Sequence, residues 1–340
     1  MLDLLTPEMM LLILVVVMAL SFDFINGFHD TANAIATSVS TRALSPRTAI
    51  IIASSFNLIG ALSYTGVAKT IGGGITDPFQ LENGLVVVLA ALIAAILWNI
   101  ITWYFGIPSS SSHAIIGGVA GAAIGAAGFD SLNWAGFISI VQALIVSPLV
   151  AFAVGFIVIK LVSKLVANTA YHKTNRKFRM MQVLSASWQS FSHGANDAQK
   201  TMGVITIALV SGGFLHQEPG EFIIPLWVKI AAAVAMAAGT AFGGWRIIKT
   251  LGGKIMKIKP ISGFSADLSS ALIITIFTAL KLPVSTTHVI TSAILGVGAS
   301  QKLNAVKWGV AGRIVITWLI TLPITGLLAA ASYVVLDVFL

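Results

Sequence analysis

Cysteine is absent from this 340-residue chain, and charged residues are scarce. Without cysteine, the chain has no disulfides, thiolate metal sites or cysteine nucleophiles. Charged residues make up 9% of the chain and hydrophobic residues 57%, so a soluble protein of this length could not cover its surface. Apolar stretches that approach the roughly 20 residues of a bilayer-crossing helix recur along the chain. They are residues 9–26, 48–64, 85–104, 137–159, 223–242, 268–280 with their flanks, and 310–336. The composition predicts an all-α polytopic membrane protein.

The basic residues are concentrated in two connections, at positions 160–179 and 246–259. Clusters of this kind mark cytoplasmic loops in membrane proteins, so the net charge of +8 does not indicate nucleic-acid binding. We therefore expect a multi-pass protein of the cell membrane whose 160–179 connection is cytoplasmic and whose termini lie outside.

One polar pattern occurs twice, 167 residues apart, inside apolar sequence. The first copy is Asp23, Asn26, Asp30, Asn33 and Thr37, and the second is Ser190, His193, Asp197, Lys200 and Val204. Both copies step by 3, 4, 3 and 4 residues, which places each set on one face of a helix. Because a charged group at membrane depth costs about 2.5–3.5 kcal/mol, these stripes indicate a transport function.

Three further matches follow in the same order. Residues 69–75 match 249–255, residues 108–113 match 283–288, and Pro148 matches Pro323. At each equivalent connection one half is clearly more basic than the other, so the positive-inside rule places the two connections on opposite sides of the membrane. We predict two inverted-topology repeats of about five crossings each, residues 1–164 and 180–340, joined by a basic connection at 165–179. Interrupted or re-entrant helices would surround a central site.

Two places favour such interruptions. Residues 9–38 are too long for one straight span, and Gly27 is the natural break. Residues 108–128 are rich in glycine and serine, which favours a re-entrant hairpin.

The stripes carry groups suited to a small cation. Asp30 with Asn26 and Asn33 offers several hard oxygen ligands on one face, and Asp23 has no acidic counterpart in the second copy. Lys200, three residues after Asp197, could complete an anion site. The alternative is that these groups only join helices by hydrogen bonds.

Each Ser/Thr run after a proline is typical of a helix start, where free N–H groups and the helix dipole favour an oxyanion. Its candidate ligands are Ser110, Ser111, Ser285 and Thr286. The alternative is helix capping without a ligand. His113 and His288 follow these runs, and we interpret them as hydrogen-bonded structural histidines, with proton transfer as the alternative. We interpret Arg313 as a side chain that extends to the membrane–water interface. For Asp267, the sequence leaves two roles open, an ion ligand or a contact between helices.

At these residues the chain resembles the inorganic phosphate transporter (Pit) family of sodium- or proton-coupled symporters. The family signature Gly-Ala-Asn-Asp-Val-Ala-Asn-Ala is similar to residues 27–34 and 194–201, and the Pro-x-Ser-Ser/Thr-Ser/Thr-His element is found at 108–113 and 283–288. The resemblance covers nearly the whole chain. The first copy departs from it with Phe28 and His29 where Ala and Asn are usual.

The resemblance implies phosphate as the substrate, coupled to sodium or protons, with no cofactor and no transition-metal site. Asp23 together with the Asn and Ser/Thr oxygens makes sodium the preferred coupling ion. The phosphate ligands that the resemblance implies are Ser110, Ser111, Ser285, Thr286, Asp30, Asn33, Asp197 and Lys200. The sodium ligands it implies are Asp23, Asn26, Asp30, Asn196 and Asp197. Sulfate, another oxyanion or a metal–phosphate complex as cargo, and a homodimer, are left open.

Two other classes of protein remain as alternatives, an oxyanion channel and a membrane enzyme acting on lipid phosphates. We do not expect an enzyme, because Ser112 and His113, like Thr287 and His288, are adjacent in sequence and do not face each other on a helix.

Overall fold

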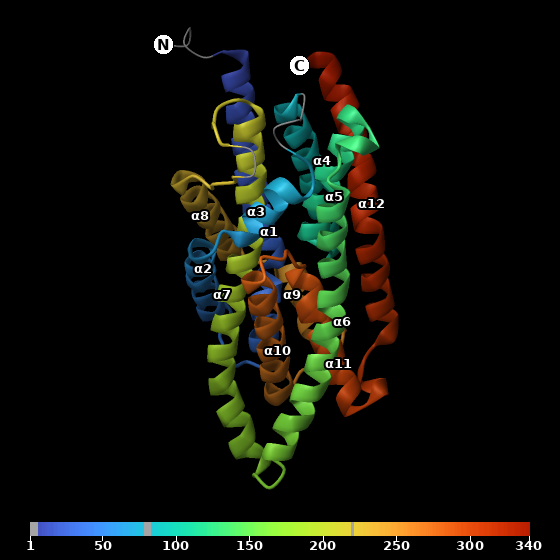
Figure 1. Cartoon of the computed structure of the whole chain (residues 1–340). Coiled ribbons are helices and arrows are strands. Elements are labelled where there is room, and N and C mark those ends of the chain that lie inside the picture. The colour runs from blue at the N-terminus through green and yellow to red at the C-terminus, as the bar shows by residue number, and fades with distance from the viewer. Residues whose placement is uncertain (1–5, 78–82, 219–220) are drawn as a thin grey trace.

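The computed structural model describes residues 6–77, 83–218 and 221–340, and these form α-helices joined by short connections (Figure 1). In chain order the helices are α1 (Pro7–Ser40), α2 (Pro46–Ser63), α3 (Gly66–Gly74), α4 (Gly84–Phe105), α5 (Ser111–Ala127), α6 (Trp134–Leu165), α7 (Tyr171–Ser211), α8 (Leu226–Phe242), α9 (Trp245–Lys249), α10 (Pro260–Ala279), α11 (Thr286–Gln301) and α12 (Trp308–Phe339). Short turns η2 (Phe129–Ser131), η3 (Thr250–Lys254, a π-helix) and η4 (Leu303–Ala305) complete the order. The all-α prediction is confirmed. Residues 1–5 of the predicted first repeat lie outside the described residues.

Local sequence sets several helix starts. Thr6 and Ser45 accept hydrogen bonds from the first turns of α1 and α2, and a proline follows each of them. Ser110 and Ser285 cap α5 and α11 in the same way, through the N–H groups of His113 and His288. The predicted helix starts in the two Ser/Thr runs are thus confirmed.

The helices recur in the same order in the two halves of the chain. The helices α5 and α11 have 17 and 16 residues, and α6 and α12 have 32 each, with Pro148 and Pro323 inside the last pair. In Figure 1, α1 runs downward from the N-terminus and α7 runs upward, and α6 and α12 are also antiparallel. This arrangement supports inverted repeats, whose placement across a bilayer stays a prediction.

Two helices in each half are interrupted or short. The pair α2 and α3 bends by 66° at its break, and α8 bends by 58° from the segment formed by α9 and η3. The helix α5 is apolar but only 17 residues long. Among the described residues, five helices are long and apolar enough to cross a membrane, or seven if each bent pair is one span. Interrupted helices are therefore confirmed, and the number of crossings stays a prediction.

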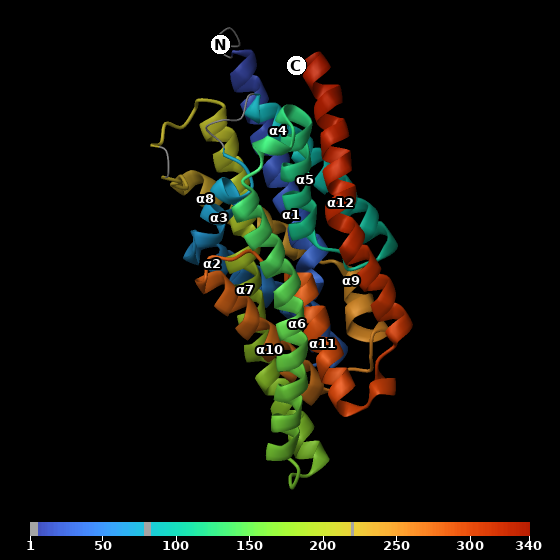
Figure 2. The same cartoon turned by 45° about the vertical axis from the view of Figure 1, so that its right-hand side comes forward.

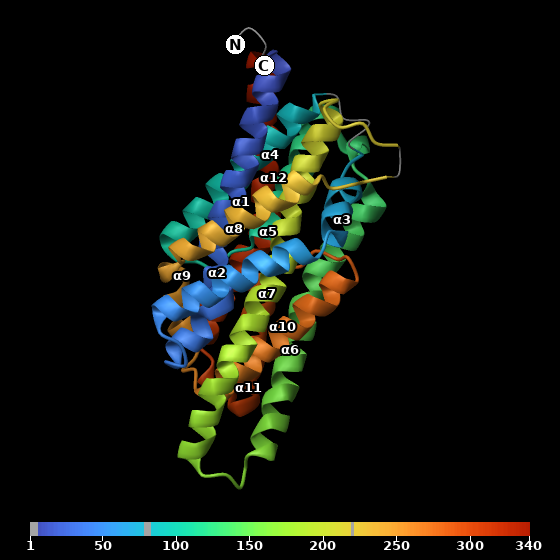
Figure 3. The same cartoon turned by 90° about the vertical axis from the view of Figure 1, so that its left-hand side faces the viewer.

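Helices of one half pack against helices of the other. The short helix α5 lies on α12, and its equivalent α11 lies on α6 (Figure 2). In the same reciprocal way α2 lies on α7, as Figure 3 shows, and α8 lies on α1. The first half therefore cannot bury its apolar faces without the second.

The predicted break at Gly27 is wrong, because α1 continues through it to Ser40. The missing side chain at Gly27 instead lets the backbone of α8 approach, since a Cβ atom there would overlap the carbonyl oxygen of Met236. Gly194 on α7 faces the backbone of Asn57 on α2 in the same way. Both glycines therefore serve close helix packing beside the polar stripes.

Candidate functional site

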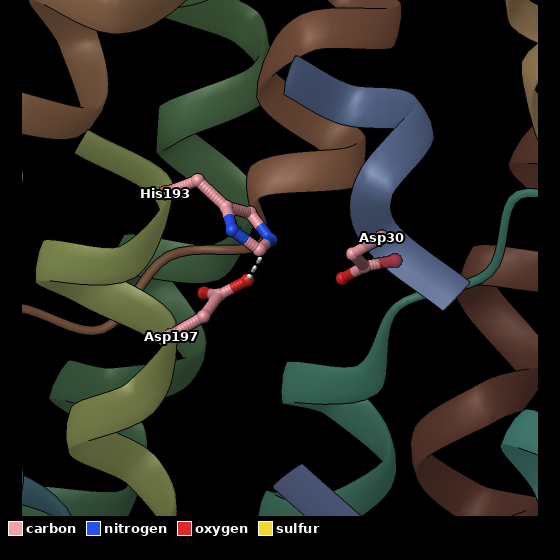
Figure 4. A group of neighbouring side chains, drawn as sticks. All are labelled: Asp30, His193 and Asp197. Atoms are coloured by element: carbon pink, nitrogen blue, oxygen red, sulfur yellow. Dashed lines mark ion pairs between the residues drawn. The ribbon is translucent and has the colours of Figure 1, made fainter. Parts of the chain in front are cut away.

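Two aspartates from the two halves meet at the centre of the helix bundle. Figure 4 shows Asp30 on α1 facing Asp197 on α7, with His193 one turn before Asp197. The nitrogen Nε2 of His193 lies 3.1 Å from Oδ2 of Asp197, and one ligand atom from each of the three side chains lies within 4.8 Å of the others. All three side chains are buried, so this group could hold a cation.

Hydroxyl groups at the starts of α5 and α11 close the site from both halves. Ser111 donates to Oδ2 of Asp30 at 3.0 Å, and Thr287 donates to Oδ1 at 3.1 Å. Thr286 donates to Oδ2 of Asp197 at 2.8 Å. Each aspartate is thus bonded to the start of α11, and Asp30 also to the start of α5. The site brings together the stripes and the Ser/Thr runs.

Lys200 is fully buried and joins three elements. Its ammonium group pairs with Oδ1 of Asp197 and donates to the hydroxyl of Ser112 at 2.6 Å. It also donates to the carbonyl oxygen of Val284 at 2.8 Å. A buried ammonium group is stable only when it is paired in this way, so its position is strongly fixed.

The remaining predicted phosphate ligands lie at the edge of this centre. Asn33 donates from Nδ2 to the hydroxyls of Thr286 and Thr287, at 3.3 and 2.8 Å. The hydroxyls of Ser110 and Ser285 accept the N–H groups of His113 and His288, and among the described residues neither serine is hydrogen-bonded to Asp30 or Asp197. Their role as ligands stays a prediction.

Four buried oxygens of Asp23, Asn26 and Thr201 have no hydrogen-bond partner among the described residues. These are the two carboxylate oxygens of Asp23, Oδ1 of Asn26 and Oγ1 of Thr201. Thr201 on α7 lies beside Asp23. Carboxylate, amide and hydroxyl oxygens are the ligands that hard cations prefer.

The predicted cation ligand Asn196 is engaged elsewhere. Its Nδ2 donates to Thr278 at 2.9 Å, and its Oδ1 accepts the N–H group of Val284 at 3.1 Å. In this structure it holds the turn before α11, and a role in cation binding stays a prediction.

Sequence reasoning missed three side chains of the site. Ser112 and Thr287 were inside the recognised runs, but only the packing of α5 and α11 shows which hydroxyls face inward. His29, singled out only as a departure from the signature, contacts Oδ1 of Asp30 through Nδ1 at 2.7 Å, and its Nε2 lies 3.2 Å from Thr102. It orients a central carboxylate.

Asp267 and the histidines of the Ser/Thr runs lie outside this centre. Asp267 on α10 accepts hydrogen bonds from Thr37 at 2.6 and 2.8 Å and from Ser185 at 3.5 Å, so in this structure it is a helix contact. The rings of His113 and His288 lie 4.5 Å apart, and His288 stacks on Trp318 at 3.9 Å. These contacts support a structural role for both histidines.

Residues 26–329 match the model of the Phosphate transporter family. A "Probable low-affinity inorganic phosphate transporter" of Bacillus subtilis (strain 168) is 60% identical over 97% of this chain and 98% of its own length. A protein of the same description from Rhizobium meliloti (strain 1021) is 47% identical over 96% of this chain and 97% of its own.

A solved structure, "The sodium-dependent phosphate transporter", is similar with a TM-score of 0.90 and 28% identity, covering 98% of this chain and 100% of that one. The family and these relatives are named as transporters, in agreement with the prediction of a transporter and not an enzyme. The chain belongs to the phosphate transporter family.

Proposed function

We propose that the chain carries inorganic phosphate across the cell membrane by symport with sodium. The observation that carries the choice of sodium is the group of unpartnered buried oxygens at Asp23, Asn26 and Thr201. A buried carboxylate without a hydrogen-bond donor is costly, and a bound cation removes that cost. An oxygen-only ligand set suits sodium better than a transition metal.

Phosphate would bind where α5 and α11 begin. The hydroxyls of Ser111, Ser112, Thr286 and Thr287 converge there with the ammonium group of Lys200. Helix N-termini add oriented N–H groups and the positive end of the helix dipole. Ser111, Thr286, Thr287 and Lys200 now bond to Asp30 or Asp197, and Ser112 donates to the carbonyl oxygen of Val284 at 2.9 Å. These donors would turn to the phosphate oxygens when the ion binds.

The two aspartates favour phosphate over sulfate. At neutral pH a phosphate ion carries at least one hydroxyl group, whereas sulfate carries none. Asp30 and Asp197 can accept a hydrogen bond from that hydroxyl group, and they can only repel sulfate.

Electrostatics gives the reason for coupling. Asp23, Asp30 and Asp197 are buried near Lys200, the one fully buried lysine among the described residues. With His29 and His193 neutral, the centre has an excess of negative charge before any phosphate enters. Bringing a further anion there requires compensating cations. Sodium would therefore bind first, and the loaded site would then change its access by movement of one group of helices against the other.

Uptake of labelled phosphate into proteoliposomes tests this proposal, with an inward sodium gradient, an inward proton gradient, or neither. We expect accumulation above equilibrium only with sodium, and little inhibition by excess sulfate. Asp23→Asn should weaken the sodium dependence, whereas the exposed Asp130→Asn, which changes charge equally, should not.

Three results would contradict the proposal. Accumulation driven by protons alone would make the proton the coupling ion. Uptake that only equilibrates would indicate a channel, and unchanged sodium dependence in Asp23→Asn would remove the cation site.

A further inference from the structure

A basic groove lies at the turn between α4 and α5, beside α9, η3 and the start of α12. Its larger part is a pocket of about 480 Å³ lined by Lys254 and Arg313, with the hairpin turn from Phe105 to Pro108 as one wall. A smaller pocket of about 170 Å³ shares Lys254 and adds Arg246 and Lys249. Figure 2 shows α9 close to the lower part of α12.

The charge of the groove is unbalanced. Four cationic side chains line the two pockets, and no acidic residue does. Among the described residues no ion pair joins any of these four cations to an acidic side chain. Arg246 is held in place by the carbonyl oxygen of Tyr104 and lies 4.8 Å from the centre of its ring.

The fold itself does not require these cations. The equivalent turn in the other half of the chain has the same hydrogen bond. Thr70 donates to the carbonyl of Lys281 at 2.6 Å, just as Thr250 donates to the carbonyl of Gly106 at 2.9 Å. At the positions that match Lys254 and Arg313, the first half has Gly74 and Ile138. Cytoplasmic placement explains basic loops, but it does not explain Arg313, the sixth residue of a membrane helix, in one pocket with Lys254.

We propose that this groove binds the phosphate headgroup of an anionic phospholipid. The walls are apolar and face outward: Phe105 is 67% exposed and Ile316 is 59% exposed, next to Leu319 at 73%. Such surface suits acyl chains, while Lys254 and Arg313 suit a phosphodiester, and Thr250 and Thr317 line the same pocket. An inorganic phosphate ion would use the cations but would gain nothing from the exposed apolar wall.

A lipid in this groove would contact the turn that leads into α5, the helix whose start binds phosphate in the proposed function. Pro108 lines the groove and is held by the indole N–H group of Trp318 at 3.0 Å, and Ser111 of the central site follows three residues later. A bound headgroup would therefore stabilise the turn that positions the start of α5.

Spin-labelled lipids test this proposal on the full chain reconstituted in phosphatidylcholine bilayers. The immobilised fraction of spin-labelled phosphatidylglycerol is compared with that of spin-labelled phosphatidylcholine. We expect a preference of roughly fivefold for phosphatidylglycerol in the unmodified chain, falling to about parity in Lys254→Gln/Arg313→Gln. The matched control Lys173→Gln/Lys177→Gln removes two exposed charges outside the groove and should keep the preference.

The proposal fails if both double variants lose the preference equally, because the effect is then general surface charge. It also fails if inorganic phosphate, at an ionic strength matched with sodium chloride, abolishes the preference, since the groove would then hold free phosphate. Should the double variant misfold, Arg313→Gln and Arg313→Lys are compared, and only the first should lose the preference.

Discussion

Lys200 on α7 donates a hydrogen bond to Ser112 on α5 at 2.6 Å, across the boundary between the two halves of the chain. The same ammonium group reaches the carbonyl of Val284, before α11. One buried cation thus connects both hairpin starts to Asp197. Substitution of Lys200 should therefore weaken anion binding more than it changes the fold.

Lys200→Met should raise KM for phosphate by about tenfold or more, because a hydrogen bond to a charged group contributes about 1.5–3 kcal/mol. Lys200→Arg should retain part of the affinity, and the exposed Lys164→Met should behave as the unmodified chain. Size-exclusion elution checks the fold of each variant. An unchanged KM in a folded Lys200→Met protein would make this lysine a helix-packing residue.

Substitutions at the adjacent Ser110 and Ser111 should distinguish phosphate binding from helix capping. Ser111→Ala removes the donor to Asp30 and should raise KM for phosphate with little change in Tm. Ser110→Ala removes the cap of α5 and should cost about 1 kcal/mol of stability, seen as a lower Tm. Uptake kinetics and thermal unfolding of both variants check this, and reversed effects would show that Ser110 is the ligand.

Gly27→Ala should destabilise the protein by about 1–3 kcal/mol, because the new methyl group would overlap the backbone of α8 at Met236. Gly312→Ala in α12 is the matched control, since nothing lies near its Cβ position and alanine is the better helix former. Thermal unfolding in detergent compares the two. Equal Tm values would mean that α1 and α8 are not closely packed in solution.

Asp267→Asn should be tolerated, because an amide oxygen can still accept the hydrogen bonds of Thr37 and Ser185. Asp267→Leu leaves those hydroxyls unsatisfied and should destabilise the protein by about 2–4 kcal/mol. Thermal unfolding and sodium-driven uptake are measured for both. Loss of sodium dependence in a stable Asp267→Asn protein would instead make Asp267 an ion ligand.

Much of the fold was predictable because membrane helices carry their signals locally. Long apolar runs, the proline after Thr6 or Ser45, and the capping serines each act within a few residues, so the helix starts could be predicted from the sequence. The break at Gly27 could not be judged in that way. From local sequence alone, a glycine inside a helix predicts a break. Only the position of the neighbouring helix shows that the glycine instead makes room for close packing.

The central site was predictable in its residue types and only partly in its members. The repeated spacing placed Asp30 and Asp197 on helical faces, and the predicted inverted repeats implied a central site. It could not show that Ser110 caps α5 while Ser112 accepts a hydrogen bond from Lys200, since both lie in one run of serines. Asp23 was recognised as unpaired in the repeat, but its lack of donors depends on packing.

The sequence by itself determined the helical class, the duplicated order of the elements and the chemical groups of the site, because period, capping and repetition are properties of short segments. The tertiary structure decided which hydroxyls turn toward Asp30 and Asp197, and which oxygens stay without a partner. It also decided that Lys254 and Arg313, 59 positions apart in sequence, line one groove. Those outcomes depend on how α5 and α11 pack against helices of the opposite half, and no local pattern encodes that packing.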